Sequence, residues 1–289
     1  MPSLIEIRRR IRSVKNTQQI TKAMKMVSAS KLRRAQDRVI AARPYAQMLE
    51  GMVRNLAKAA AGSEEVEGHP LLAVRPEKKI QLVVVTADTG LAGGFNANVI
   101  KLSERFIAEH GDAEVILELI GRKGRDFFRR RHANVSGEHI TLFLRGSVEA
   151  APARAIAKQL VERFSKGEAD AVYIAVNHFK SVLSSTLVIQ KVLPVELPEG
   201  GEETANYIFE QPAGELLAQA LPRYVENQLF RAMLESAAAY NAARMTAMDA
   251  ATRNAGEMID KLTLNMNRVR QASITREIIE IVSGAAALG

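Results

Sequence analysis

The two ends of this chain read as helices that are too long to fold inside a compact globule. Residues 3–58 contain one proline, Pro44, and one glycine, Gly51, and a second helical pattern runs from Pro212 to about residue 287. At about 1.5 Å per residue these helices measure roughly 85 and 110 Å, whereas a compact chain of this length is only about 50 Å across. Such helices must protrude, and we expect them to pair as an antiparallel coiled coil. The longer helix then overhangs the shorter one by about 25 Å.

The apolar positions of the first helix favour a single helical partner. Their spacing is 3-4-3 at the first four positions, which are Leu4, Ile7, Ile11 and Val14. The spacing resumes in shifted registers further along, and such shifts are stutters in a coiled-coil seam. Because the apolar stripe is narrow, it suits one partner helix better than burial in a globule.

The middle of the chain predicts an α/β domain. Apolar segments alternate there with helical patterns, and a last apolar segment, expected to be an edge strand, ends at Pro194. The segments are IQLVVV (80–85), EVILELI (114–120), ITLFL (140–144), AVYIAV (171–176) and TLVIQKVLP (186–194). Near-continuous Val, Ile and Leu content is typical of strands buried on both faces, and therefore of a parallel sheet built from βαβ units.

Linkers rich in Gly, Pro and charge separate these parts, at residues 62–79 and 194–206. The predicted domains are therefore an N-terminal shaft helix at 1–61, an α/β domain at 79–194 and a C-terminal shaft helix at 207–289 that pairs with the first.

The positive charge is concentrated at the N-terminal end. Residues 1–43 hold 12 Lys and Arg and two acids, a net charge of +10, and the remaining residues hold 28 Lys and Arg and 30 acids, a net charge of −2. An anionic partner follows from this asymmetry. A nucleic acid is one reading, although no stacking aromatics and no DNA-binding motif accompany the charges. An acidic protein surface is the other.

The turn TADTGLAGGFN (86–96) raises the question of a phosphate cradle, because it lies between a predicted strand and a predicted helix. Its glycines, Gly90, Gly93 and Gly94, have the spacing GxxGG. A P-loop and a Rossmann fingerprint are both missing from the chain, which favours a structural turn over phosphate binding. IGRKGRDFFRRR (120–131) repeats the pattern with added positive charge, and a solvated helix face is favoured there over an anion site.

Several classes of site are disfavoured by composition. The chain has no cysteine, and its five histidines show no metal-ligand spacing. Asp88 and Asp126 have no second acid at a spacing that suggests catalysis. No apolar run reaches the roughly 18–20 residues that span a bilayer. The apolar C-terminal tip, ITREIIEIVSGAAALG (274–289), is expected to be received by other chains, because the length argument places it beyond its own domain.

Three stretches together resemble the gamma subunit family of F-type ATP synthases, in its bacterial form. They are NTQQITKAMKMVSASKLRRAQ (16–36), TADTGLAGGFN (86–96) and the segment 242–287, which runs from AARMTAMDAATRNAGEMI to RQASITREIIEIVSGAAA. With the segments between them, the resemblance extends from Leu4 to Ala287. It implies an antiparallel coiled-coil shaft with a central Rossmann-like domain that binds no nucleotide.

The resemblance also implies a function. Such a shaft occupies the centre of a catalytic hexamer of alternating alpha and beta subunits, and its foot meets epsilon and the membrane ring of c subunits. Proton flow turns the ring and the shaft, and the asymmetric shaft drives the three catalytic sites through different conformations. The chain itself is then no enzyme. It is present once per complex, without cofactor, nucleic acid or membrane span, and it is peripheral to the bacterial plasma membrane on the cytoplasmic side.

The family's contact residues can be carried over onto matching positions. Those implied to face an acidic beta-subunit loop are Lys22, Met24 and Lys25, and those implied to touch the hexamer are Arg244, Gln271, Thr275 and Glu280. Tyr207 and Glu210 match the foot region near epsilon and the c-ring. Two positions depart from the family pattern: Lys25 stands where an acidic residue is common, and Ala92 stands where cysteine is common. Without an inserted cysteine-bearing segment, regulation by thiols is not expected. Because the Arg-rich start aligns with the shaft helix, we expect no transit peptide before it.

Overall fold

The computed structural model describes residues 3–60, 68–132, 134–140, 148–182, 184–197 and 210–288. It divides into two compact units, one formed by residues 1–28 and 245–289 and the other by residues 29–244. Two long helices contribute to both units: α1 is Leu4–Ala59 and α6 is Ala213–Leu288. The two units are described in turn.

The start of α1 is fixed by a reciprocal cap. The Glu6 N–H donates to Ser3 Oγ at 3.2 Å, and the Ser3 N–H donates to Glu6 Oε2 at 3.0 Å. This capping box satisfies backbone donors that the first turn of a helix leaves open. It explains why the helix begins directly at the N-terminal end of the described chain.

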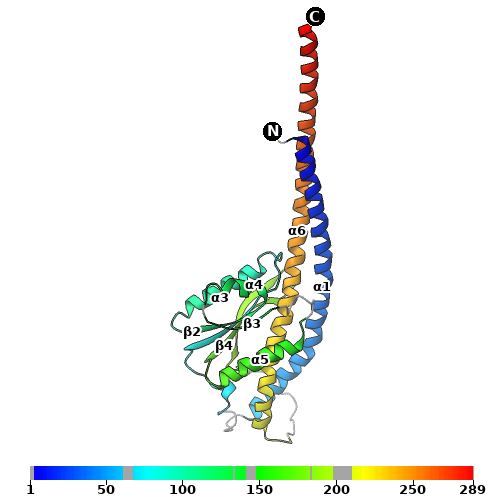
Figure 1. The fold of residues 1–289 in the computed structure, drawn as a ribbon. Coiled ribbons are helices and arrows are strands. Elements are labelled where there is room, and N and C mark those ends of the chain that lie inside the picture. The colour runs from blue at the N-terminus through cyan, green and yellow to red at the C-terminus, as the bar shows by residue number, and fades with distance from the viewer. Residues whose placement is uncertain are drawn as a thin grey trace. The chain divides into compact units, whose positions relative to one another are not determined.

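In the first unit α1 and α6 lie side by side and antiparallel (Figure 1). Lys25 Nζ lies 2.5 Å from Asp249 Oδ1, and Thr252 Oγ1 donates to Thr21 Oγ1 at 2.8 Å. Thr21 is buried in the interface between the helices. Polar groups thus lie within the contact between the two helices, and their mutual hydrogen bonds help to fix its register.

The second unit contains a five-stranded sheet in the order β3-β2-β1-β4-β5. Its strands are β1 Lys79–Val85, β2 Glu114–Ile120, β3 Val135–His139, β4 Ala171–Phe179 and β5 Ser185–Leu193. The first four run parallel, and β5 pairs antiparallel with β4. The expected fold class is confirmed, with one correction: the sheet is mixed. The short connection from Phe179 to Ser185 causes this, because so few residues can join only antiparallel neighbours.

Helices cover both faces of this sheet. Helices α3 (Phe95–Glu109) and α4 (Arg122–Phe128) lie on one face, and α5 (Ala150–Ser165) lies on the other (Figure 1). Val99 and Phe106 of α3 pack with β1 and β2 in one fully apolar cluster. The face of the sheet under α3 is therefore a continuous apolar core.

One expected strand differs from the structure. The third parallel strand is β3, Val135–His139, whereas the sequence pattern placed a strand at ITLFL (140–144). Ile140 follows β3, and residues 141–147 lie outside the described part of the chain. The polar sequence of β3, VSGEH, escaped the pattern because Ser136 and His139 bond to the buried Glu118 instead of packing apolar groups.

Candidate functional site

The carboxyl end of β1 lies where the strand order reverses, because β1 pairs with β2 on one side and β4 on the other. Open α/β sheets bind ligands in the crevice at such a point. Here Ala239 and Tyr240 of α6 pack into the position, against Ala87, Ala92 and Phe95. The Phe95 and Tyr240 rings meet edge to face with centroids 5.5 Å apart. The chain's own helix thus fills the crevice that a nucleotide would use.

Several polar groups of the glycine turn are engaged within the chain. The Ala87 N–H donates to Asn96 Oδ1 at 2.9 Å, and the Arg122 N–H donates to Asp88 Oδ1 at 3.1 Å. The Asn96 amide donates to the Thr89 carbonyl at 3.3 Å. A phosphate cradle needs backbone N–H groups that point at the ligand. These contacts instead account for the turn as a structural connection between β1 and α3.

Arg244 is anchored against the sheet unit. Its Nη1 donates to the Tyr240 hydroxyl at 3.0 Å, and that hydroxyl is hydrogen-bonded to Thr89 Oγ1. The side chain is half-buried, and its position is therefore set by contacts within the chain before any partner binds.

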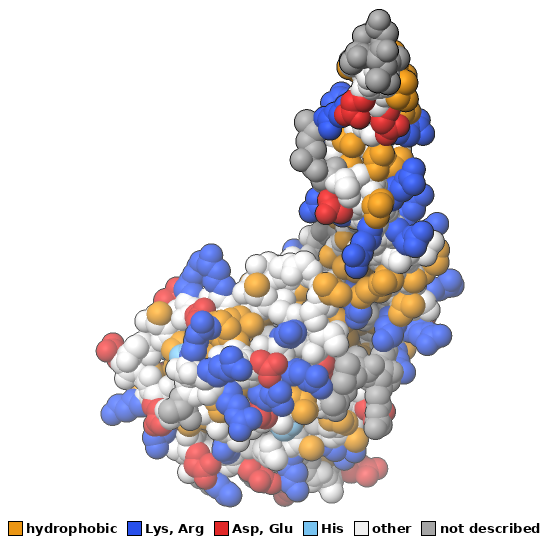
Figure 2. Space-filling view, turned by 45° about the horizontal axis from the view of Figure 1, so that its top comes forward, with side chains coloured by type: hydrophobic (Ala, Val, Ile, Leu, Met, Phe, Trp, Pro, Cys, Tyr) orange, Lys and Arg blue, Asp and Glu red, His pale blue; other side chains and the backbone are white. Residues whose placement is uncertain are grey.

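Within the described part of the chain, no other helix pairs with the end of α6. Continuing the register of the contacts at Lys25 and Thr21 places the start of α1 opposite about residue 270 of α6. From Ile274 to Gly284 every residue is exposed, including Ile281 at 71% and Val282 at 61%. Figure 2 shows hydrophobic side chains among the charged ones along this end of the helix. A contiguous apolar surface of this kind marks an interaction site.

The three polar positions expected on this end of α6, Gln271, Thr275 and Glu280, are all exposed. Thr275 Oγ1 donates to the Gln271 carbonyl at 3.0 Å, so the structure brings these two residues together on one helix face. The Gln271 amide remains available to donate and accept hydrogen bonds at the surface. The tip therefore combines apolar area with a small polar pair.

The three positions expected to face an acidic loop differ from one another in exposure. Lys22 is exposed, and Met24 is half-buried. Lys25 is paired with Asp249, and this hydrogen bond lowers the pKa of the Asp249 carboxyl below its ordinary value. Asp249 also pairs with Arg253 at 2.8 Å. Because its charge is already compensated by Asp249, Lys25 offers an outside partner less than Lys22 does.

Comparison with known proteins agrees with this arrangement. Residues 3–288 match the family model described as ATP synthase. An ATP synthase gamma chain from Solibacter usitatus is 61% identical over 287 residues, which cover 99% of both chains.

The chain belongs to the ATP synthase gamma chain family.

Solved structures carry the same fold. A chain of the Tetrahymena thermophila mitochondrial ATP synthase, in a structure of the central stalk and c-ring, has a TM-score of 0.62 and 25% identity, with 80% of this chain and 99% of that chain covered. A chain of the Euglena gracilis mitochondrial ATP synthase rotor has a TM-score of 0.65 and 19% identity, with 94% and 98% covered. The gamma chain identification made from the sequence is confirmed.

The structure describes one of the two residues that are expected near the foot of a gamma chain. Glu210 is exposed at the bend that precedes α6. Tyr207 lies outside the described residues. Among the residues that are described, we find no helix with both the length and the apolar character needed to cross a bilayer.

Sequence reasoning missed two histidine–glutamate pairs. His139 Nε2 lies 2.5 Å from Glu118 Oε1, and His178 Nδ1 is hydrogen-bonded to Glu235 Oε2. Both glutamates are buried. Their signal was present in the sequence, since each interrupts an apolar run, EVILELI for Glu118 and AMLESAAAY for Glu235. A buried carboxylate requires a partner, and histidine is the partner in both cases.

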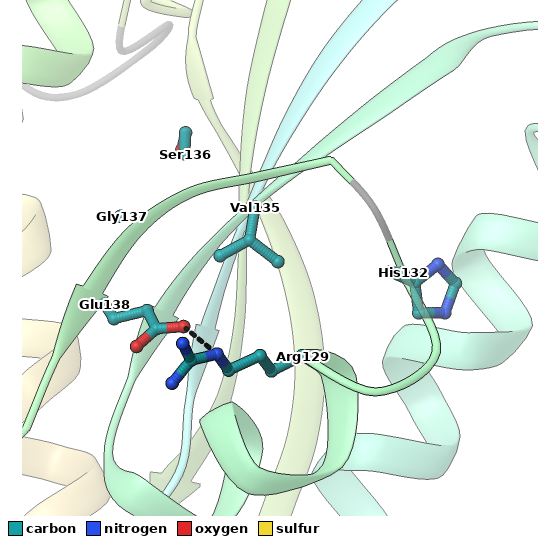
Figure 3. Close-up of a pocket in the computed structure, with 6 residues that line it drawn as sticks. All are labelled: Arg129, His132, Val135, Ser136, Gly137 and Glu138. Carbon is teal, nitrogen blue, oxygen red and sulfur yellow. Dashed lines mark ion pairs between the residues drawn. The ribbon is translucent and has the colours of Figure 1, made fainter.

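An open pocket of about 410 Å³ lies beside the edge strand β3 (Figure 3). Arg129 reaches across it to Glu138 with a nitrogen–oxygen distance of 3.9 Å, and His132 stands on the opposite side. Arg122 and Lys123, at the start of α4, are also exposed. Because the cation and the carboxylate at the pocket compensate each other, this geometry agrees with a solvated basic face, and we assign no ligand to it.

The His178–Glu235 pair predicts a specific dependence of stability on pH. The hydrogen bond to Glu235 raises the pKa of His178 above its ordinary value of 6.5. Burial alone would raise the pKa of Glu235, but hydrogen bonds from His178 and Arg231 hold it below its ordinary value of 4.5. The contribution of His178 to the free energy of unfolding is complete below pH 6.5 and is lost as the pH rises through its folded pKa. The glutamate contribution is complete above 4.5 and is lost as the pH falls through its folded pKa.

We therefore expect Glu235→Gln to lower the free energy of unfolding most strongly between about pH 4.5 and 6.5, with a smaller loss at pH 9. Urea unfolding of both proteins at several pH values measures this difference. The exposed Glu215 of α6 provides the matched control, because Glu215→Gln should give a small and nearly constant difference. A loss for Glu235→Gln that grows steadily from pH 5 to pH 9 would contradict the assigned pairing.

Proposed function

We propose that this chain is the central rotor shaft of an ATP synthase. It couples proton flow through the membrane c-ring to ATP synthesis and hydrolysis at the alpha/beta hexamer, and it does so without catalysing a reaction itself. The crevice at the end of β1 is filled by Tyr240, so the sheet unit serves as a scaffold. The proposed location is the cytoplasmic side of the plasma membrane, peripheral to it and carried by the complex.

The single observation that carries this proposal, beside the family, is the bare end of α6. A helix that exposes Ile278 and Ile281 over its last turns is poorly stable alone in water, since apolar area of this kind favours burial. A sleeve formed by other subunits buries it without fixing one rotational position. The antiparallel pairing of α1 and α6 then acts as a coiled coil that transmits torque.

The contact residues follow from the same proposal. Lys22 and Met24 face the acidic loop of a beta subunit, with Lys25 as a weaker participant because Asp249 already compensates it. Those that contact the hexamer from α6 are Arg244, Gln271, Thr275 and Glu280. Tyr207 and Glu210 contact epsilon and the c-ring at the foot.

A reconstitution experiment tests the function directly. The purified chain is mixed with alpha and beta subunits, and we expect a complex with one copy of the chain per hexamer and rotation-linked ATP hydrolysis. A chain that binds DNA with sequence preference at physiological salt, and leaves alpha and beta unassembled, would favour the nucleic-acid reading instead. Nonspecific binding that disappears as salt rises reflects only the charge of α1.

The polar pair at the tip gives a prediction about rate. We expect Gln271→Leu combined with Thr275→Val to leave assembly nearly intact and to slow steady-state ATP hydrolysis several-fold. A hydrogen bond contributes about 0.5–1.5 kcal/mol, which is too little to hold a complex together, whereas about 1.4 kcal/mol changes a rate tenfold. Subunit stoichiometry and turnover of the purified complex are the measurements.

Thr263→Val is the matched control for this pair. Thr263 Oγ1 donates to the Ile259 carbonyl at 2.8 Å, the same local contact that Thr275 makes, but it lies where α6 still has α1 beside it. ATP hydrolysis by the complex that carries Thr263→Val should match that of the wild-type complex. Unchanged turnover in the double variant would remove the pair from the mechanism, and loss of assembly would make its role structural.

A further inference from the structure

A second pocket, of about 330 Å³, lies in the unit formed by residues 29–244. Four elements meet there: α1, α6 and the antiparallel strands β4 and β5. Its polar lining includes Glu50 from α1, His178 and Gln190 from the strands, and Tyr224, Asn227 and Arg231 from α6. Asn227 and Arg231 are four residues apart and therefore share a helix face. The volume lies at the lower end of the range for small-molecule pockets.

Buried contacts hold two of the lining groups in place. Glu235, which is itself buried, accepts from Arg231 Nε at 2.9 Å through one carboxylate oxygen and from His178 through the other. His178 Nε2 lies 3.1 Å from Gln190 Oε1. Both ring nitrogens of His178 thus face acceptor oxygens, which is the arrangement that suits an imidazolium with two N–H donors.

These contacts leave donors at the pocket. Arg231 uses Nε toward Glu235, and Gln190 uses its oxygen toward His178. None of the contacts among the described residues occupies the terminal nitrogens of Arg231 or the Gln190 amide nitrogen. The guanidinium is therefore oriented from behind with its terminal donors still available, which is the geometry that binds carboxylate or phosphate oxygens in pairs.

The local charge also favours an anion. Among the described residues, the carboxylate that lines the pocket is Glu50, and the carboxylate behind it is Glu235, which pairs with Arg231 and His178. Glu50 accepts from Arg54 at 3.1 Å and is compensated by it. Neither carboxylate is left without a partner, so a bound anion would meet the Arg231 guanidinium and not an uncompensated negative charge.

We propose that this pocket binds a small oxyanion, either inorganic phosphate or a small carboxylate, through Arg231, Gln190 and Asn227. The occupant would link α1, α6 and the β4–β5 edge of the sheet. The proposal rests on these side chains alone and is independent of the rotor function.

Calorimetric titration of the full-length chain tests the site. Inorganic phosphate and succinate are titrated separately, with ionic strength held constant by sodium chloride. We expect saturable binding of one or both at one site per chain, with a dissociation constant at or below about 1 mM. Binding should also raise the melting temperature of the chain with ligand concentration. Phosphate binding alone would identify a phosphoryl ligand, and succinate binding alone would identify a carboxylate.

Arg231→Gln should weaken binding by about tenfold or more, because it removes a charge-assisted pair of hydrogen bonds. Asn227→Leu should also weaken it while leaving the Glu235 contacts intact, which guards against a folding defect in the first variant. Arg223→Gln is the matched control, since Arg223 is an exposed arginine on the same helix that does not line the pocket. Absence of saturable binding for both anions, or equal weakening by Arg223→Gln, would overturn the proposal.

Discussion

Gly121→Ala is expected to destabilise the sheet unit by roughly 2–5 kcal/mol. Alanine is strained at the backbone angle of this position, and its methyl group has no room there. Gly121 has φ +93°, and a Cβ at this position would lie 2.1 Å from the carbonyl oxygen of Thr86. That oxygen belongs to backbone at the end of β1, which is paired on both sides and cannot move away. Denaturant unfolding, followed by hydrogen exchange of the β1 amides, measures the loss.

Gly51→Ala is the contrasting control. Gly51 lies inside α1, and a Cβ there would meet nothing within 4 Å. Alanine should therefore stabilise the helix by about 0.5–1 kcal/mol through its higher helix propensity. Gly121 follows β2 and Thr86 follows β1. If Gly121→Ala unfolded at the same denaturant concentration as wild type, these two residues would not lie as close together as described.

Much of the fold was predictable because periodicity and length are direct physical signals. The strand pattern IQLVVV became the centre of the sheet, since every residue from Ile80 to Val85 is buried on both faces. The direction of β5 was not readable in the same way. Its apolar content matches that of a parallel strand. It is antiparallel because the connection from Phe179 to Ser185 is short.

The interior polar groups were the hardest part to predict. Glu118 lies 3% exposed in the middle of β2, where Gln81, Ser136 and His139 bond to it, and Gly137 leaves room for its carboxylate. These partners come from two different strands, β1 and β3. A single sequence shows that the glutamate interrupts an apolar run, but it does not show which polar residues the topology will bring to it.

Some features of the candidate contact residues could be predicted from the sequence, and others could not. Exposure of Gln271, Thr275 and Glu280 followed from the length of α6 relative to α1. The anchoring of Arg244 by Tyr240 did not follow from any pattern, since it requires α6 to pack across the end of β1. The pairing of Lys25 with Asp249 was not predictable either. It depends on the register between two helices, and the two residues are 224 positions apart in sequence.

The largest effect on assembly is expected from the exposed apolar side chains at the end of α6. Replacing Ile278, Ile281 and Val282 together by Asn should leave the free chain as stable as wild type, because all three are more than half exposed. Asn also has a helix propensity close to that of Val and only slightly below that of Ile. In the complex, each fully buried side chain of this type contributes about 1.5–3 kcal/mol. Losing three of them should weaken binding to an alpha/beta hexamer by at least about tenfold even if burial is only partial.

Circular dichroism of the free chain and a pull-down with alpha and beta subunits separate the two effects. Val74→Asn supplies the control, since Val74 is 83% exposed in the sheet unit and outside the proposed sleeve. Its assembly should match wild type. Because a bearing must bind its shaft without selecting one angle, nondirectional apolar contact suits this end of α6 better than a ring of salt bridges would. Normal assembly of the triple variant would therefore place the main affinity elsewhere on the chain and remove the tip as the bearing surface.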